Sequence, residues 1–313
     1  MSNTNESAGH GPLPPVGWVG TGIMGRSMAG HLLAAGHPLR VCTRTRSKAE
    51  DLLARGASWA STPAEAAAGA SIVCTNVGLP AEVEEVYFGP SGVLAGVGPG
   101  QLLVDFGTTP PSLARRIAEA ARAAGAAALD APVSGGDVGA RNATLSIMVG
   151  GDAEAFERAR PLLERVGRTI VHQGEAGAGQ RTKIVNQVLV AASTVGMCEA
   201  LHFGRVAGLD LDRVLASVGG GAAASWALSV LAPRVLKGDL DPGFLVEHLV
   251  KDLRIARSDA VELGLSLPLL DLCLVRYEAL LAAGHGRKGT QGLGLLLEGE
   301  TGDPVDASGS PVQ

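Results

Sequence analysis

The sequence predicts two domains of different class, an α/β domain with a parallel sheet followed by an all-helical domain. From Val16 to His172, short apolar runs alternate with helical stretches. Such alternation is typical of a parallel sheet with helices on both faces. After Gly179 the hydrophobic periodicity becomes helical almost throughout, to about Ala283. We therefore expect a domain boundary near Ala178.

The elements follow from local patterns. Short apolar runs predict strands at residues 15–19, 39–43, 71–76, 101–106, 127–129, 144–149 and 169–172. Helical periodicity predicts helices at residues 25–36, 48–55 and 112–124. In the second domain, glycines and prolines divide the helical pattern at residues 208, 219–221, 233, 242–243 and 268.

Two tails flank the domains. Residues 1–15 are rich in Ser, Asn, Gly and Pro, and residues 298–313 are polar and rich in turn formers, so we expect the first to be disordered and the second ragged. The predicted organisation is therefore an α/β domain over residues 16–178 and an all-helical domain over residues 179–297.

Composition narrows the class of protein. The chain has 313 residues, of which 46% are hydrophobic and 18% charged, as expected of a globular protein. A net charge of −5 argues against a nucleic-acid partner, which needs a basic surface. We expect no membrane-spanning helix and no secretory signal, and hence a cytoplasmic protein. The cysteines show no C-x-x-C pattern and are expected to be buried in a reduced compartment: Cys42, Cys74, Cys198 and Cys273.

A glycine-rich turn follows the first expected strand and precedes a helix. In such a turn the first glycine permits a tight bend, the second lets the backbone approach a pyrophosphate, and the third allows close helix–strand packing. The N–H groups of the helix N-terminus attract the same anion. We expect the turn to bind NAD or NADP through Gly20, Thr21, Gly22, Ile23, Met24 and Gly25.

The end of the second strand bears on the choice between these cofactors. An NAD-binding domain usually carries an acid there, for the ribose 2′-hydroxyl. This chain instead has Thr43, Arg44 and Thr45, and no acid before Glu50. Because an arginine can bind a 2′-phosphate with two hydrogen bonds, the pattern favours NADP and leaves NAD possible. The alternative is a basic loop that contacts nothing.

The segment Asp130-Ala-Pro-Val-Ser-Gly-Gly is a candidate anion site. Ser134, Gly135 and Gly136 can direct consecutive N–H groups and a hydroxyl at one point, which would suit a carboxylate. The alternative is an ordinary turn with no ligand.

Lys183 is the candidate catalytic residue. It follows a glycine-rich turn and opens a long helical stretch, with Asn186 and Gln187 three and four residues later. A helix would place these three polar side chains on one face. Taken alone, this pattern is more typical of a solvated surface lysine, and only the accompanying motifs favour the catalytic role.

Other chemistries lack a pattern. The seven histidines form no metal-binding motif, and no G-x-S-x-G sequence indicates a serine hydrolase. We therefore expect no metal, and packing or surface roles for His172, His202 and His248.

Taken together, the segments resemble the β-hydroxyacid dehydrogenase family, which includes 3-hydroxyisobutyrate dehydrogenase and tartronate semialdehyde (2-hydroxy-3-oxopropionate) reductase. The likeness runs from about Val16 to Leu297. It rests on the motifs at residues 20–25, 79–80, 105–108, 130–136, 177–187 and 251–253.

The resemblance implies a Rossmann domain, an all-helical domain and an active site between them. It implies that Lys183 is the catalytic acid or base, and that Asn186 or Gln187 holds the substrate. Ser134, Gly135 and Gly136 would bind the substrate carboxylate. On the cofactor side it implies roles for Leu79, Pro80, Thr108 and Lys251.

Two departures from the family pattern concern the substrate. Gly107 replaces the serine of the common D-x-S-T motif, and Gly289-Thr-Gln-Gly replaces a D-x-S-A motif near the C-terminus. Both leave the class of reaction intact but weaken the inference to one named substrate.

We therefore expect an NAD(P)-dependent enzyme that interconverts a small 3-hydroxy acid and its semialdehyde. The alternatives are an imine or neutral-carbonyl reductase of the same superfamily, and a non-catalytic dinucleotide-binding sensor. The apolar run 188–192 on the Lys183 helix further predicts a homodimer or homotetramer.

Overall fold

A computed structural model describes residues 13–299. The chain divides into two compact units, and the division falls after Lys183, within helix α9 (Ala178–Val206). Of the two tails, residues 1–12 and 300–313 lie outside the described residues. Residues 13–15, assigned to the N-terminal tail, belong to the folded unit, since the Pro15 carbonyl accepts hydrogen bonds from Ser71 and Ile72. Residues 298 and 299 end helix α14 (Gly294–Gly299).

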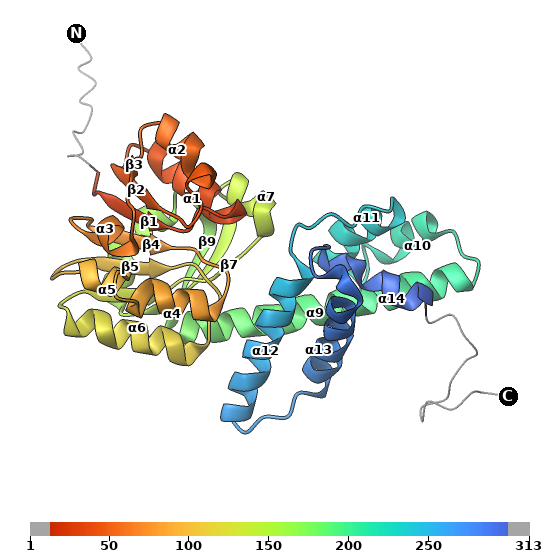
Figure 1. Ribbon diagram of the computed structural model, residues 1–313. Coiled ribbons are helices and arrows are strands. Elements are labelled where there is room, and N and C mark those ends of the chain that lie inside the picture. Colours follow the sequence, from red (N-terminus) through yellow and green to blue (C-terminus); the bar gives the residue numbers. More distant parts are fainter. Residues whose placement is uncertain (1–12, 300–313) are drawn as a thin grey trace, which may run out of the picture. The chain divides into compact units, whose positions relative to one another are not determined.

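The first unit is built on one mixed sheet, as Figure 1 shows. Its order is β3-β2-β1-β4-β5-β6-β8-β7, with β9 paired to β8. The strands from β3 to β6 are parallel, β8 runs antiparallel to β6 and β7, and β9 is parallel to β8. Their bounds are β1 (Val16–Val19), β2 (Leu39–Cys42), β3 (Ser58–Trp59), β4 (Ile72–Thr75), β5 (Leu102–Asp105), β6 (Ala127–Asp130), β7 (Val133–Ser134), β8 (Leu145–Gly151) and β9 (Gly167–Gly174). The predicted strands are all present, and β3 and β7, with two residues each, were missed.

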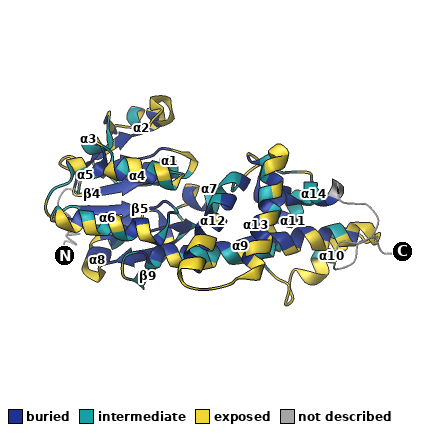
Figure 2. Ribbon diagram, turned by 60° about the horizontal axis from the view of Figure 1, so that its bottom comes forward, coloured by how far each residue is buried: buried dark blue, intermediate teal, exposed yellow. Residues whose placement is uncertain are grey.

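Helices cover both faces of this sheet, so the central strands are buried on both sides. Successive residues of β1 belong to hydrophobic clusters on opposite faces of the sheet. Trp18 belongs to the cluster that includes residues of α1 (Ile23–Ala34), α2 (Glu50–Ala54), α7 (Gly136–Arg141) and α8 (Ala153–Leu163). Val19 packs on the other face, with α3 (Pro63–Ala67), α4 (Pro80–Phe88), α5 (Val93–Gly96) and α6 (Pro111–Ala123). Figure 2 shows the strands β4 and β5 as buried throughout.

Several helices of this unit were not predicted. Helix α4 gave a weak periodic signal, because it buries only Val83 and Tyr87, whereas α8 buries five residues but contains Pro161, a residue that is unusual inside a helix. The helix expected over residues 48–55 is a 3-10 turn, η1 (Arg46–Ala49), followed by α2.

The second unit is helical throughout its described part. Beyond α9 it contains α10 (Leu211–Val218), the π-helical turn η2 (Ala227–Leu231), α11 (Ala232–Leu236), α12 (Val246–Glu262), α13 (Pro268–Leu280), the π-helical turn η3 (Leu281–His285), the 3-10 turn η4 (Thr290–Leu293) and α14. Val195, Leu253, Leu274 and Tyr277 lie in its core. Pro233 was expected to break the helical pattern, but η2 runs directly into α11 and the helical conformation continues past this residue.

No apolar run of membrane-spanning length was expected, but helix α9 contains one. Its 29 residues include an 18-residue window with a mean hydropathy of 1.5, long and apolar enough to cross a bilayer. Burial accounts for part of this composition, since Ala191, Val195 and Leu201 belong to the core of the helical unit. We interpret α9 as a core helix.

The turn between β1 and α1 depends on two glycines. Gly20 has a φ of +98°, and a Cβ on Gly25 would lie 2.2 Å from the Gly20 carbonyl oxygen. Gly22 differs, because a Cβ there would meet no atom within 4 Å.

We expect Gly25→Ala to lower the free energy of unfolding by about 2 kcal/mol or more, because the backbone of the turn must move. Gly22→Ala is the matched control and should unfold at nearly the wild-type denaturant concentration. Urea titration followed by far-UV circular dichroism tests both. Equal midpoints for Gly25→Ala and the wild type would contradict this account of the turn.

Candidate functional site

The parallel strands place several predicted site residues at one edge of the sheet. The segments that follow β1, β2, β4 and β5 leave the carboxyl ends of neighbouring strands, where α/β sheets bind ligands. These segments contain the glycine turn at Gly20–Gly25, residues 43–45, residues 79–80 and Thr108.

The glycine turn is exposed at Gly22 and Ile23. Gly22 precedes α1 and faces open space, and no side chain caps the helix N-terminus. The buried Thr21 hydroxyl oxygen makes no hydrogen bond within the part of the chain described. The N–H groups of an uncapped helix start attract an anion, and Gly22 has no side chain to block it. This arrangement suits a pyrophosphate, with the Thr21 hydroxyl as a further hydrogen-bonding group.

Arg44 lies directly after β2, and its side chain is 87% exposed. Its guanidinium makes a 2.7 Å ion pair with the carboxylate of Glu82, in the first turn of α4. Glu82 also accepts a hydrogen bond from the Leu79 N–H, while Pro80 is the first residue of α4. The structure therefore joins the segments of Arg44 and Leu79 through an acid that sequence reasoning missed. Thr43 is half-buried and Thr45 is exposed.

A buried polar network holds the segment after β5. The Thr75 hydroxyl donates to Asp105 over 2.7 Å, and the Gly107 N–H donates to the same carboxylate. The Tyr87 hydroxyl lies 2.9 Å from the Thr75 hydroxyl, and burial, with the Asp105 charge, raises the pKa of Tyr87 well above its usual range. A Cβ on Gly107 would lie 3.2 Å from both Asp105 and the Val77 carbonyl, so glycine suits this turn, which leads to the half-buried Thr108.

The predicted anion-binding segment forms the junction between β7 and α7. Ser134 ends β7, and Gly135 and Gly136 both have positive φ angles, +130° and +63°. Two successive residues of this kind turn the backbone sharply before α7 begins at Gly136. The conformation is compatible with N–H groups that converge on one anion.

Lys183 is buried, with 7% of its surface exposed. Its ammonium donates a 2.8 Å hydrogen bond to the carbonyl of Val133, the residue before Ser134. The structure thus brings the candidate catalytic residue and the candidate anion site together, although they lie about 50 residues apart in the sequence. The surface-lysine alternative is excluded by this burial.

The start of α9 is fixed by a buried carboxylate. Asp130, at the end of β6, accepts hydrogen bonds of 2.8 Å from the N–H groups of Gly177 and Gln180. Burial raises the pKa of Asp130, and these N–H donors oppose the shift. The amide side chain of Gln180 in turn donates to the Gly107 carbonyl and accepts from the Thr109 N–H. Sequence reasoning assigned no role to Asp130 or Gln180.

The remaining predicted polar residues form a chain in the helical unit. The Asn186 amide donates to Gln187, and Gln187 donates to the carboxylate of Asp252 over 2.6 Å. Lys251 makes a 2.8 Å ion pair with the other Asp252 oxygen. Burial and the Lys251 charge lower the pKa of His248.

Asp252 lies in the motif at residues 251–253 but was given no role, because it is one of several charged residues in α12 and its burial is set by the fold. Gln291, in the segment that replaces a D-x-S-A motif, is buried and donates to the carbonyls of Asp239 and Asp241, which is a structural role.

Both halves of the chain match known families. Residues 15–174 match the NAD-binding domain of 6-phosphogluconate dehydrogenase, and residues 177–296 match the NAD-binding domain of NADP-dependent 3-hydroxyisobutyrate dehydrogenase. Together the two matches span most of the chain, including every predicted site residue. They support an NAD(P)-binding protein without deciding between the two cofactors.

Individual relatives agree with these matches. A probable 3-hydroxyisobutyrate dehydrogenase-like protein of Arabidopsis thaliana is 44% identical over 94% of this chain and 88% of its own. The 2-hydroxy-3-oxopropionate reductase of Escherichia coli is 38% identical over 90% and 97%. A Mycobacterium tuberculosis 3-hydroxyisobutyrate dehydrogenase, solved with L-serine, superposes with a TM-score of 0.84 at 32% identity, over 91% and 99%. The chain is therefore an oxidoreductase that belongs to the 3-hydroxyisobutyrate dehydrogenase family.

Proposed function

We propose that this dehydrogenase interconverts a small 3-hydroxy acid and its semialdehyde, of the 3-hydroxyisobutyrate or tartronate semialdehyde type. The observation that carries the proposal is the position of Lys183, whose ammonium lies 2.8 Å from the Val133 carbonyl and next to the Ser134 turn. The Lys183 ammonium can donate to a carbonyl oxygen while the Ser134 turn binds an anionic group of the same small molecule. A sensor would have no use for such a proton donor.

The nicotinamide, when bound, supplies or accepts the hydride. In reduction, Lys183 gives a proton to the carbonyl oxygen as it becomes a hydroxyl, and in oxidation it takes that proton back. The Val133 carbonyl accepts from the ammonium and so orients it. Thr108 and Lys251 are proposed to contribute on the nicotinamide side.

The substrate carboxylate is proposed to bind the turn at Ser134, Gly135 and Gly136, through N–H groups and the serine hydroxyl. Asn186, or its neighbour Gln187, is proposed to hold the substrate as well. Gln187 is engaged by Asp252, so Asn186 is the more available of the two amides.

Lys183→Ala should lower kcat by about 100-fold or more, the usual effect of losing a general acid or base. The dissociation constant of the reduced cofactor should change little, because the lysine is assigned to the substrate. Stopped-flow turnover and cofactor fluorescence titration measure the two quantities. A variant that keeps more than about a tenth of wild-type kcat, a loss below ~1.4 kcal/mol, would remove Lys183 from the mechanism.

An anionic substrate should be preferred over its neutral analogue. A 3-oxo acid should give a kcat/KM at least about 10-fold above that of its methyl ester, and Ser134→Ala should shrink the difference mainly through KM. Steady-state assays of both substrates with both proteins test this. Similar kcat/KM values for acid and ester would favour the imine or neutral-carbonyl alternative.

NADP is proposed as the preferred cofactor, with NAD as a poorer one. Support comes from Arg44, which lies after β2 with an exposed guanidinium and can meet a 2′-phosphate. Its ion pair with Glu82 must rearrange or share the guanidinium when a phosphate binds, so Glu82 should moderate the preference.

Arg44→Asp should weaken NADPH binding by about 10-fold or more relative to NADH, because a charge-assisted contact is lost and a like charge is added. Glu82→Gln is the complementary variant: it frees Arg44, keeps an oxygen for the Leu79 N–H, and should strengthen NADPH binding selectively. Fluorescence titrations with both cofactors decide the matter. Equal losses for NADH and NADPH in Arg44→Asp would mean that Arg44 does not contact the phosphate.

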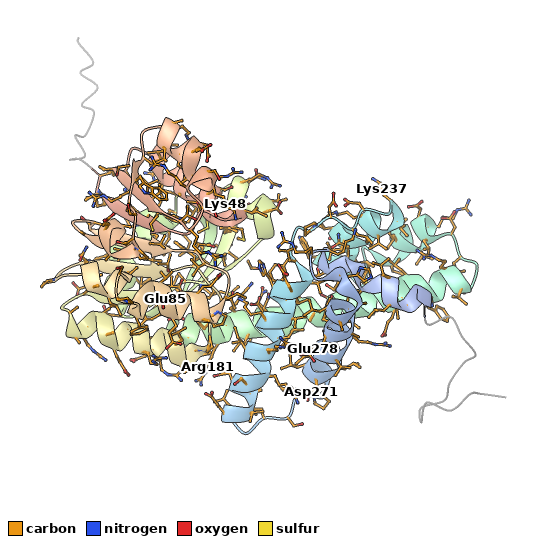
Figure 3. The ribbon with its side chains drawn as sticks, in the orientation of Figure 1. Lys48, Glu85, Arg181, Lys237, Asp271 and Glu278 are labelled. Atoms are coloured by element: carbon orange, nitrogen blue, oxygen red, sulfur yellow. The ribbon has the colours of Figure 1, made fainter. Side chains whose placement is uncertain are left out.

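A homodimer or homotetramer is proposed, built on apolar surface of the helical unit. Val185 and Leu189 on α9 are 60% and 65% exposed. Leu269, Leu272 and Val275, spaced three residues apart on α13, are each at least 50% exposed and form a stripe along that helix. Figure 3 labels Asp271 and Glu278 on the same helix, which instead pair with arginines of α12. Exposed apolar surface of this extent is typical of a protein interface.

Light scattering at micromolar concentration should give at least twice the 31.7 kDa mass of one chain. Leu272→Asp combined with Val275→Asp should lower that mass, because burial of two carboxylates in an apolar interface is costly. Glu262→Gln, which changes one exposed charge on α12, serves as a control and should leave the mass unchanged. A wild-type protein that stays at the monomer mass would contradict the proposal.

A cytoplasmic location is proposed with this assembly. All four cysteines are free and buried, as expected for a reducing compartment. Part of the apolar surface of α9 is buried in the core of the helical unit, and the exposed part is assigned to the proposed interface.

A further inference from the structure

Gln180 joins two segments to which the proposed function assigns different tasks. Its side-chain amide is fully buried, with 0% exposed surface. The Nε2 group donates to the Gly107 carbonyl over 2.9 Å, and Oε1 accepts from the Thr109 N–H over 3.0 Å. The two bonds bracket Thr108, so a single planar group holds the backbone on both sides of that residue.

The backbone of Gln180 is held as firmly as its side chain. Its N–H donates to Asp130, which also accepts from Gly177, so the first turn of α9 is fixed to the end of β6. Lys183 follows three residues later, one turn along the same helix and on the same side. Its own ammonium is held by Val133.

The surrounding backbone leaves the helix start no room to shift. A Cβ on Gly179 would lie 2.4 Å from the Met148 carbonyl, and a Cβ on Gly150 would lie 2.6 Å from the Gly179 nitrogen. A change at Gln180 must therefore be taken up by the segment 107–109 rather than by α9.

Only an amide, or a protonated carboxyl, offers a donor and an acceptor in one planar group of this size. A carboxylate in the place of Gln180 would turn an acceptor toward the Gly107 carbonyl, and an apolar side chain would leave both backbone groups unpaired. Each buried group without a partner is costly. The residue type at this position is thus set by the backbone of residues 107 and 109.

We propose that Gln180 is a positioning residue for hydride transfer: it sets the placement of the Thr108 segment relative to Lys183. The inference rests on the proposed function, in which Thr108 contributes on the nicotinamide side and Lys183 addresses the substrate oxygen. Neither the amide nor Asp130 touches substrate. They fix the position of the Thr108 segment relative to Lys183.

Gln180→Met provides the first test. Methionine has a similar length and volume and neither hydrogen-bonding group. We expect kcat to fall by about 10- to 100-fold, the scale of a displacement of about 1 Å at a reacting centre, with a change in cofactor dissociation constant below about 3-fold. The deuterium isotope effect with 4-deuterated reduced cofactor should rise, because hydride transfer becomes slower than product release.

Gln180→Glu gives a readout that a merely structural role would not move. Protonated, the introduced carboxyl donates to the Gly107 carbonyl and accepts from Thr109, as the amide does; ionised, it lacks the donor. The ratio of variant to wild-type kcat should therefore fall as pH rises, following one ionisation. Asp105, Asp130 and Lys183 lie on the segments that meet there, and both proteins contain them, so the variant is compared with the wild type at each pH.

Gln101→Glu is the matched control. Gln101 precedes β5 at the opposite end of the strand, and its amide also binds backbone, donating to the Ala67 carbonyl over 2.8 Å and accepting from the Gly98 N–H. The same substitution there should lower the melting temperature while the pH dependence of kcat stays parallel to that of the wild type. If Gln180→Met fails to fold, the comparison within Gln180→Glu across pH still answers the question.

The outcomes distinguish failure of the role proposed for Gln180 from failure of the proposed function. Loss of activity in Lys183→Ala, with a pH-dependent ratio in Gln180→Glu and a parallel profile in Gln101→Glu, supports the inference. A Gln180→Glu ratio that is constant with pH, or a Gln180→Met kcat within about 3-fold of wild type, overturns the inference and leaves the proposed function standing. Retained activity in Lys183→Ala overturns the proposed function itself.

Discussion

One buried carboxylate fixes the part of the structure on which the site depends. Asp130 ends β6 and holds the first turn of α9 through two backbone N–H groups. An anion at a helix N-terminus is favourable because the helix dipole and the unpaired N–H groups both attract it. Because the glycines at positions 150 and 179 let the backbones approach so closely, this one contact determines where the buried Lys183 lies.

The helical unit contains a second buried acid that contacts α9, further along the same helix. Asp252 is buried and binds Gln187 and Lys251, so α9 is engaged by an acid in each unit. Buried carboxylates are costly to remove from water and need compensating partners. Asp130 is compensated by backbone N–H groups, and Asp252 by the Gln187 amide of α9 and the Lys251 ammonium of α12.

Local patterns predicted much of the fold and part of the site. The buried strands, the glycine turn and Lys183 each leave a signature within a dozen residues, and a parallel sheet then brings the strand ends together. The roles of Asp130, Gln180 and Glu82 were not predictable in this way, because their partners lie far away in sequence and are set by packing. Helix α4 escaped notice because it buries only two residues, whereas α8 was overlooked although it buries five residues, and it contains Pro161.

The strength of the ion pair between Arg44 and Glu82 depends on ionic strength. Because the Arg44 side chain is largely solvent-exposed, its interactions are screened strongly by salt. A doubly charged phosphate loses more attraction to the guanidinium than a singly charged carboxylate does when salt is added. If Arg44 contacts the 2′-phosphate as proposed, the discrimination between NADP and NAD depends on the buffer as well as on the residues, and it narrows as the salt concentration rises.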